Sequence, residues 1–266
     1  MLKDITLGQY YPVKSPVHSL DARVKILLSI AFMVAVFCVK GAVSYVVLAV
    51  FTAAIIKLSN IPFRFMLKGI KPIMFFIVFT AVLNVFLTGG TPIWQLGFLK
   101  ITSEGLSYAA LMVIRIVFLV FGTSLLTYTT SPIQLTDGLE ALLRPFSKIG
   151  LPSHELAMMM SIALRFIPTL LEETDKIMKA QTARGADVES GNIVKRAKAL
   201  IPLLVPLFIS AFRRADELAT AMECRCYHGG NNRTKLHEPK LCKKDLYAIV
   251  VFVAFVVVIT ITNIIF

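Results

Sequence analysis

Long runs of apolar residues constrain the fold of this chain more than any other feature of its sequence. A helix needs about 20 mostly apolar residues to cross a bilayer, where its backbone groups must be satisfied within the helix itself. The chain has only 17% charged residues, whereas a soluble domain has about 25%. The apolar runs cover residues 24–39, 42–56, 72–87, 105–128 and 246–266. We therefore expect an all-α membrane protein with about five transmembrane helices.

The charged residues are concentrated between the last two of these runs. Residues 130–245 hold 17 of the 28 basic and 13 of the 16 acidic side chains. The chain is therefore predicted to have three parts: an N-terminal arm with four spans (1–129), a charged helical domain (130–245) and a final span (246–266). No cleaved signal peptide is expected, because a long polar or mixed arm precedes the first apolar run and no small-residue cleavage site follows it.

Basic residues distinguish the two sides of the membrane. The N-terminal arm, residues 64–71 and residues 130–245 are rich in Lys and Arg, whereas the loops near Lys40 and at 88–104 carry few. Cytoplasmic loops carry the excess of basic residues, so the N-terminus is predicted to be cytoplasmic and the C-terminus extracellular in a plasma membrane. The net charge of +12 is explained in the same way. No zinc-finger or RNA-binding signature accompanies it, so the expected partner is the lipid bilayer and not nucleic acid.

The sequence contains no familiar catalytic motif. It lacks a P-loop, a Gly-x-Ser-x-Gly turn and the protein-kinase signatures, so we expect neither enzymatic activity nor an ATP site on this chain. His154-Glu155 resembles the start of a zinc-protease motif, but the second histidine is replaced by Met158. No resident cofactor or metal is expected.

Two long amphipathic helices, with a shorter one before them, are predicted within the charged domain. The first covers residues 153–185, with Ser153 as its N-cap and Gly185 as its stop, and the second covers residues 193–227. Pro202 and Pro206 are expected to kink the second helix. At 1.5 Å per residue each helix reaches about 45–50 Å, long enough to cover another protein. The apolar stripes are Leu156, Met160, Ala163, Ile167 and Leu170, and Leu204, Leu207, Ala211, Ala215, Leu218 and Met222.

The two long helices end alike, in Ala180-x-x-x-Arg184 and Ala221-x-x-x-Arg225. An exposed guanidinium at a helix end can fork onto a carboxylate or onto backbone carbonyls of a partner. It can equally be a solvated cation that the helix dipole favours. A third possibility is a metal site formed by Cys224, Cys226 and His228. Their spacing is only a weak zinc pattern, and Arg225 between the thiols would compete with a bound cation.

Arg115 is the one charge well inside an apolar run. An ionisable group in the membrane costs several kcal/mol unless it is paired or faces protein, so it is a functional candidate by default. The alternatives are a buried structural pair or a contact with the cytoplasmic helices. A coupled carrier is expected to show more such residues.

Several segments together resemble a known family. Residues 19–25 are similar to an N-terminal Leu-Asp-Pro-Arg-x-Lys stretch, with Ala22 in place of proline. Residues 129–132, followed by Leu139-Glu140, resemble the family's exit from the membrane. The most specific pieces are residues 163–168 (Ala-Leu-Arg-Phe-Ile-Pro) and 180–185 (Ala-Gln-Thr-Ala-Arg-Gly). The chain therefore resembles the transmembrane coupling (T) component of energy-coupling factor transporters, the vitamin- and metal-uptake branch of ABC transporters.

The resemblance implies a scaffold role in a complex of several subunits. The two long helices would cross and lie on two ABC-type ATPase subunits, which would hold the ATP and magnesium. A small membrane protein, the S component, would bind the substrate and dock on the same scaffold. The implied contact residues for the ATPases are Ala183, Arg184, Gly185, Cys224, Arg225 and Cys226, supported by Gln181, Arg165, Pro168, Arg23 and Asp21. In the second motif Cys224-Arg225-Cys226 replaces the family's small-Arg-Gly sequence, which puts a glycine role there in doubt.

A stand-alone secondary carrier or channel, with residues 130–245 as a regulatory domain, is the alternative function. A membrane enzyme is a third possibility, which the missing catalytic motifs oppose. The sequence leaves open whether the cargo is a vitamin or a metal ion, whether the two ATPases are identical, and whether several S components share the chain.

Overall fold

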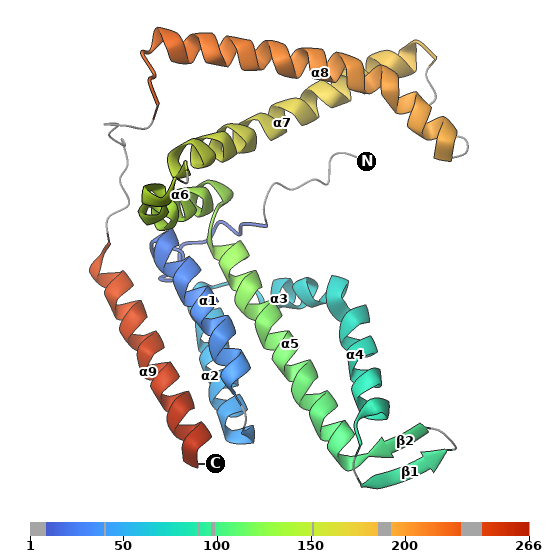
Figure 1. The fold of residues 1–266 in the computed structure, drawn as a ribbon, viewed down its shortest axis with the longest axis vertical. Helices are drawn as coiled ribbons and strands as arrows, with labels where there is room; N and C mark the ends of the chain where they lie inside the picture. The colour runs from blue at the N-terminus through green and yellow to red at the C-terminus, as the bar shows by residue number, and fades with distance from the viewer. Residues whose placement is uncertain are drawn as a thin grey trace. The chain divides into compact units, whose positions relative to one another are not determined.

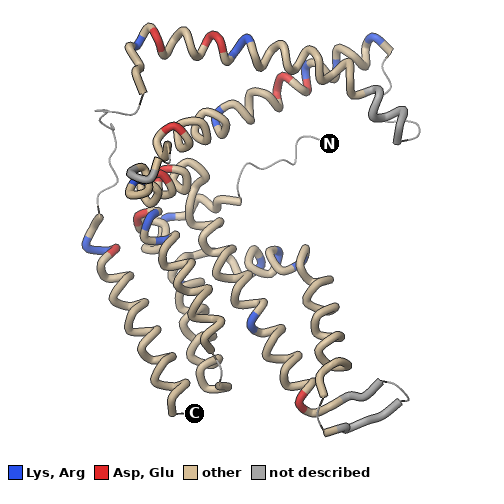
Figure 2. The backbone as a smooth tube through the Cα atoms, in the orientation of Figure 1, with Lys and Arg blue, Asp and Glu red and all other residues tan. Residues whose placement is uncertain are grey.

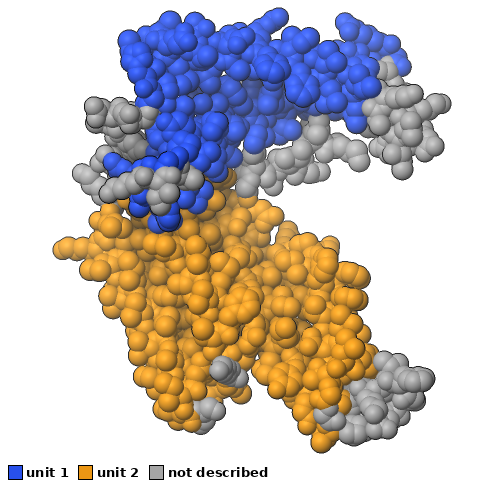
Figure 3. All heavy atoms as spheres, in the orientation of Figure 1, with its two compact units in different colours: residues 1–7, 139–238 blue, residues 8–138, 239–266 orange. Residues whose placement is uncertain are grey.

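The described part of the chain is almost entirely helical. The computed structural model describes residues 9–39, 41–89, 91–96, 99–150, 152–185, 193–229 and 241–265. They divide into two compact units (Figure 3). The membrane unit contains residues 8–138 and 239–266, and the helical-arm unit contains residues 139–238. The domain boundaries predicted at residues 130 and 245 lie several residues from these divisions and stay a prediction.

The membrane unit contains the predicted spans (Figure 1). Its long helices are α1 (Ala22–Cys38), α2 (Ala42–Ser59), α4 (Met74–Leu87), α5 (Ser103–Thr129) and α9 (Lys243–Ile265). α1 begins where it does because the Asp21 side chain accepts a hydrogen bond from the Arg23 N–H, which caps the helix N-terminus. Each predicted span agrees with a helix to within a few residues, so the prediction of an all-α membrane protein is confirmed.

Length and composition select a slightly different set of spans from the one predicted. Five helical segments among the described residues are long and apolar enough to cross a membrane: 42–59, 63–87, 103–129, 153–183 and 243–265. α1 is missing from this set because it has only 17 residues. The segment at 153–183 has a mean hydropathy of 1.2, the lowest of the five. The predicted number is confirmed, while the cytoplasmic position of residues 153–183 stays a prediction.

The core of the membrane unit lies where α1, α2 and α9 meet, and α5 packs on α1 and α2. The rings of Phe51 in α2 and Phe255 in α9 stack with their centroids 3.7 Å apart. Gly122 allows α5 to approach α1 closely, because a Cβ atom there would lie 2.7 Å from the Phe32 ring. Large apolar side chains on the outer faces of the spans are exposed, as a lipid-facing surface requires, with Phe75 and Leu87 above 70%.

Two segments that were expected to be loops contain short helices and strands. The chain between α2 and α4 forms α3 (Phe63–Ile70) and the 3-10 turn η2 (Lys71–Ile73), and residues 88–102 hold the antiparallel strands β1 (Pro92–Leu96) and β2 (Leu99–Thr102). The base of this hairpin is fixed by Glu104, whose carboxylate accepts hydrogen bonds from the backbone and side chain of Thr91. Elements this short are poorly marked by hydrophobic periodicity, which needs a longer window.

Figure 2 shows few charges along the spans. Arg115 is a charged residue near the middle of the α5 sequence. Its Nη2 atom donates to the Val39 carbonyl at 3.1 Å, and the Asn263 amide donates to the Cys38 carbonyl at 2.9 Å. The last carbonyls of a helix have no partner within it, so these two side chains satisfy the end of α1. Within the described residues Arg115 thus bonds to backbone and forms no ion pair, so the predicted buried pair is not found there, whereas the predicted contact with the cytoplasmic helices stays a prediction.

The helical-arm unit is built from α7 and α8, and the end of a shorter helix lies before them in the sequence. α6 (Pro132–Leu143) begins in the membrane unit and is followed by η3 (Arg144–Ile149), α7 (Ser153–Ala183) and α8 (Ile193–Cys224). Ser153 was predicted to be the N-cap of α7, but it is the first helical residue, and the cap position is held by Pro152 without a side-chain hydrogen bond. The Ser153 side chain is buried instead.

Candidate functional site

The helices α7 and α8 cross in opposite directions (Figure 1). Near the end of α7, the Gln181 side chain donates to the Pro202 carbonyl at 3.4 Å. Two turns earlier in α7, Glu173 pairs with Arg214 at 3.4 Å. Because later positions in α7 meet earlier positions in α8, the two helices are antiparallel where they touch. The end of α7 therefore lies beside the first half of α8, while the end of α8 projects away from the crossing.

The Gln181 contact follows from the proline spacing of α8. In a helix the Pro202 carbonyl accepts from the N–H four residues later, and that residue is Pro206, which has no N–H. The orphaned carbonyl is satisfied by Gln181 of the neighbouring helix. In Figure 1, α8 bends in its first half, the half that contains both prolines. The pair of prolines thus creates both the bend and the acceptor that holds the tip of α7 against it.

This explanation predicts a non-additive pair of substitutions. Gln181→Ala is expected to destabilise the helix pair by about 1 kcal/mol, because the Pro202 carbonyl loses its donor. In a Pro206→Ala background an N–H returns to that carbonyl, so the same Gln181→Ala change is expected to cost about 0.3 kcal/mol or less. Thermal unfolding of the four proteins in mild detergent measures the coupling. Equal costs in the two backgrounds would contradict the explanation.

The α7 tip ends in a left-handed glycine. Arg184 is the C-cap, with its N–H directed at the carbonyls of Ala180 and Gln181, and Gly185 follows with φ of +87°. The Gly185 N–H bonds to the Thr182 carbonyl at 3.0 Å. This is the helix stop that the sequence predicted for Gly185. Ala183, Arg184 and Gly185 are all exposed, so nothing in the described residues covers the guanidinium.

The α8 tip has the same cap without a glycine. Arg225 takes the cap position and Cys226 follows with φ of +54°, in the left-handed region. The Cys226 N–H bonds to the Glu223 carbonyl at 2.9 Å, and the Tyr227 N–H bonds to the Met222 carbonyl at 3.1 Å. These two bonds define a Schellman motif. The α8 cap therefore forms without a glycine, because Cys226 adopts the left-handed conformation that Gly185 has in α7.

The cap geometry predicts opposite effects for two neighbouring cysteines. Cys226→Gly is expected to stabilise the α8 tip by up to about 1 kcal/mol, because an L residue is strained in the left-handed region. Cys224→Gly, two residues earlier and helical, is expected to destabilise it by about 1 kcal/mol. Hydrogen exchange at the amides of residues 222–227 measures both. Faster exchange in Cys226→Gly would refute the cap assignment.

The two tips present a repeated feature at separate points. Arg225 is exposed like Arg184, and it lies about 35 Å along α8 from the crossing at Pro202. The thiols of Cys224 and Cys226 are free and exposed. His237, which follows the Cys224–His228 segment in the sequence and could add a ligand, lies outside the described residues, and within those described no group of His, Cys, Asp or Glu could hold a metal ion. The tips are therefore suited to donate hydrogen bonds and positive charge to a surface.

The supporting residues lie in different places. Arg165 and Pro168 are exposed on α7, before the crossing, and Gln181 joins the helices as described above. Asp21 and Arg23 belong to the membrane unit and are not part of the α7 and α8 tips. The structure therefore divides the predicted set into two sites.

The second site, a polar latch, lies at the start of α1 and α9. Asp245 is 2% exposed, and its two oxygens accept from the backbone N–H groups of Asp21 (2.8 Å) and Cys242 (2.7 Å). Lys25 is also buried and donates to the carbonyls of His18 and Thr129. The latch thus joins the N-terminal arm, α1, the end of α5 and α9. Asp245 was not predicted as a site residue, and Lys25 entered only as the lysine of the 19–25 stretch, although each is a charge at the edge of an apolar run.

His18 completes the arm side of the polar latch. Its Nε2 lies 3.0 Å from the Tyr11 carbonyl, so Nε2 carries the proton, and Nδ1 can accept from the Ser15 hydroxyl at 2.7 Å. Burial is the main reason why the pKa of His18 lies below its usual value, and the charge of Lys25 adds to this effect. The imidazole is therefore neutral at physiological pH.

α8 exposes a broad apolar surface that the predicted stripe only partly describes. Leu203 is buried, and Leu207, Ala211, Leu218 and Met222 are half-buried. Leu204 and Ala215 of the predicted stripe are exposed, Leu204 at 46%. Leu204 belongs to an exposed apolar face formed by Ile201, Leu204, Val205, Phe208, Ile209 and Phe212. An apolar surface of this kind on one helix marks a place where another protein or lipid binds.

These features define a multi-pass membrane protein with two crossing helices, and residues 13–236 match the family described as cobalt transport protein, CbiQ. Relatives named energy-coupling factor transporter transmembrane protein are similar over almost their whole length. The Clostridium kluyveri protein is 60% identical over 250 residues, 93% of each chain. The Bacillus subtilis protein is 49% identical over 251 residues, 94% of this chain and 95% of its own. The chain therefore belongs to the CbiQ family and, within it, to the transmembrane components of energy-coupling factor transporters.

Proposed function

We propose that this chain transmits the conformational change of two ATPase subunits to a substrate-binding membrane protein in a micronutrient importer. The observation that carries the proposal is the matched pair of tips, in which Arg184 and Arg225 hold the same cap position at the ends of two crossing helices. Two equivalent contacts at separate points suit a pair of related subunits. ATP and magnesium would bind on those subunits, and the N-terminus of this chain would be cytoplasmic.

The exposed apolar face of α8 supports a second contact. Its six side chains are solvated in the isolated chain, and burying one large apolar side chain contributes about 1.5–3 kcal/mol. A small, apolar S component fits this face better than a charged ATPase does. Movement of the tips would then reach the S component directly, because the face lies on the same helix as Arg225 and beside the crossing with α7.

Co-purification tests the proposal. The chain is extracted in mild detergent with its associated proteins, which are identified by mass spectrometry and assayed in liposomes. Recovery of ABC-type ATPases with a small membrane protein, and uptake that requires ATP, is the expected result. Transport by the purified chain alone would favour the secondary carrier or channel instead.

A further inference from the structure

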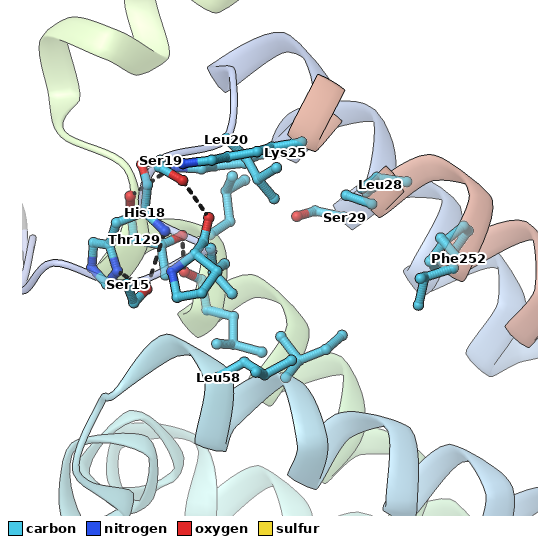
Figure 4. A pocket seen from close by; sticks show the side chains of 18 of the residues that line it. Ser15, His18, Ser19, Leu20, Lys25, Leu28, Ser29, Leu58, Thr129 and Phe252 are labelled. Atoms are coloured by element: carbon cyan, nitrogen blue, oxygen red, sulfur yellow. Dashed lines mark hydrogen bonds between the residues drawn. The ribbon is translucent and has the colours of Figure 1, made fainter. Parts of the chain in front are cut away.

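A large cavity lies in the membrane unit between the N-terminal arm and the helices α1, α2, α5 and α9. Its volume is about 1210 Å³, above the roughly 300–1,000 Å³ of most small-molecule pockets. Figure 4 shows Ser15 and His18 of the arm on one side, Ser29 of α1 and Phe252 of α9 on the other, and Leu58 of α2 below. The cavity is thus a hollow among the spans, at the end where the arm lies.

The cavity exists because only part of α9 packs tightly. Phe252, Phe255 and Ile259 belong to the core shared with α1 and α2, whereas the first part of α9, from Lys243 to Val251, lines the cavity. From Lys243 to Phe252 the helix rises about 14 Å at 1.5 Å per residue. One leaflet of the hydrocarbon core is about 15 Å thick, half of about 30 Å. The cavity is therefore about as deep as one leaflet.

The walls of the cavity are apolar and its rim is basic. Leu28, Phe32, Phe51, Ile55, Leu125 and Val251 are among the wall residues. Ordered water needs two or more polar partners, and these wall residues offer none. An apolar chain fits the walls better than solvent does.

Four lysines line the cavity, and no carboxylate does so among the described residues. Lys14, Lys243 and Lys244 are exposed, and none of them forms an ion pair in the described part of the chain. Lys25 is buried deeper and bonded to backbone carbonyls. Asp245 is close by, but both of its oxygens already accept backbone N–H groups. The three exposed lysines therefore leave the rim with an excess of positive charge, which the carboxylate of Asp245 in the first turn of α9 offsets only in part.

We propose that this cavity binds one anionic phospholipid, with an acyl chain between α1, α2, α5 and α9 and the headgroup phosphate at Lys14, Lys243 and Lys244. The depth matches one leaflet, and the basic rim matches the headgroup charge. Basic pockets between transmembrane helices bind anionic headgroups in this way. The bound lipid would fill the gap between the first half of α9 and the rest of the unit, and would steady the arm that carries the polar latch.

The headgroup half of the proposal is tested with rim lysines. The full chain is exchanged into nanodiscs that contain phosphatidylglycerol and phosphatidylcholine, and retained lipid is counted by native mass spectrometry. Replacing Lys14, Lys243 and Lys244 with Ala is expected to weaken phosphatidylglycerol binding roughly a hundredfold, about fivefold per lysine. The control replaces Lys57, Lys68 and Lys71 with Ala. This removes the same amount of charge from residues that do not line the cavity, and it is expected to change phosphatidylglycerol binding less than threefold.

The acyl half is tested by filling the cavity. Ser29→Phe and Ala248→Phe place a ring in the hollow, and both are expected to eject the retained lipid. Leu27→Phe and Ile249→Phe are the controls, because these neighbouring side chains are exposed and do not line the cavity. Thermal unfolding of each variant establishes that it is folded.

The expected result is one retained phosphatidylglycerol, lost in the rim and filled variants and kept in both sets of controls. Equal retention of phosphatidylcholine would overturn the proposal, since the rim would then not select charge. Full retention in the filled variants would also overturn it, because the lysines would merely attract lipid to the surface. Stabilisation by inorganic phosphate equal to that by phosphatidylglycerol would show a headgroup site without an acyl site, and would refute it as well.

Discussion

Reversing the charge of either tip arginine is expected to abolish ATP-driven uptake while leaving the chain in the membrane. Arg184→Glu and Arg225→Glu each place a carboxylate where the helix end offers exposed carbonyls, and each removes a guanidinium that can fork onto a partner. Losing one side of a buried charged hydrogen bond costs about 2–5 kcal/mol, so ATPase binding should weaken at least about thirtyfold. Uptake in liposomes and ATPase co-purification measure the two effects separately.

Two other charge reversals serve as matched controls. Lys179→Glu and Arg213→Glu make the same change on α7 and α8, at exposed positions away from the caps, and should leave uptake within about twofold. If the tip variants and the controls lost activity alike, general electrostatics would explain the loss. Normal uptake in both tip variants would remove the coupling role from Arg184 and Arg225.

Replacing Asp245 is expected to destabilise the membrane unit by about 3 kcal/mol or more. In Asp245→Ala the buried N–H groups of Asp21 and Cys242 both lose their acceptor, and buried Lys25 loses a nearby negative charge. A hydrogen bond to a charged group contributes about 1.5–3 kcal/mol. Thermal unfolding of the detergent-solubilised chain should therefore show a clear fall in melting temperature.

Asp245→Asn separates the two contributions. The amide keeps one acceptor oxygen but has no charge, so a fall between those of the wild type and Asp245→Ala is expected. Glu104→Ala is the control, because this acidic residue at the start of α5 supports only the exposed hairpin. A melting temperature unchanged in Asp245→Ala would mean that the latch does not hold the unit together.

Hydropathy and cap signals in the sequence predicted much of this fold. The start of α8 at Ile193 is confirmed, and the start of α7 is predicted to within one residue, since Ser153 is its first helical residue and not its cap. The stop at Gly185 is confirmed by its positive φ. These features are local, so a single sequence contains them.

Features that depend on distant residues could not be predicted. The bond from the Asp21 N–H to Asp245 joins positions 224 residues apart, and nothing in either local sequence indicates the other. The left-handed conformation of Cys226 was also not predicted, because cysteine, unlike glycine, is strained at positive φ. The Gln181 contact follows from Pro202 and Pro206, but only once the helices are known to cross there.

α9 supplies groups to both ends of α1. Asp245 accepts from the residue that starts α1, and Asn263 donates to the Cys38 carbonyl at its end. A ribosome adds about 5–20 residues per second, so α1 must wait roughly 10–45 s after its own synthesis for these partners. During that interval α1 has its own Asp21 cap and, once α5 is made, the Arg115 contact, but it lacks the bonds from α9. The contacts that α9 makes with both ends of α1 therefore form late in synthesis, only after α9 has entered the bilayer.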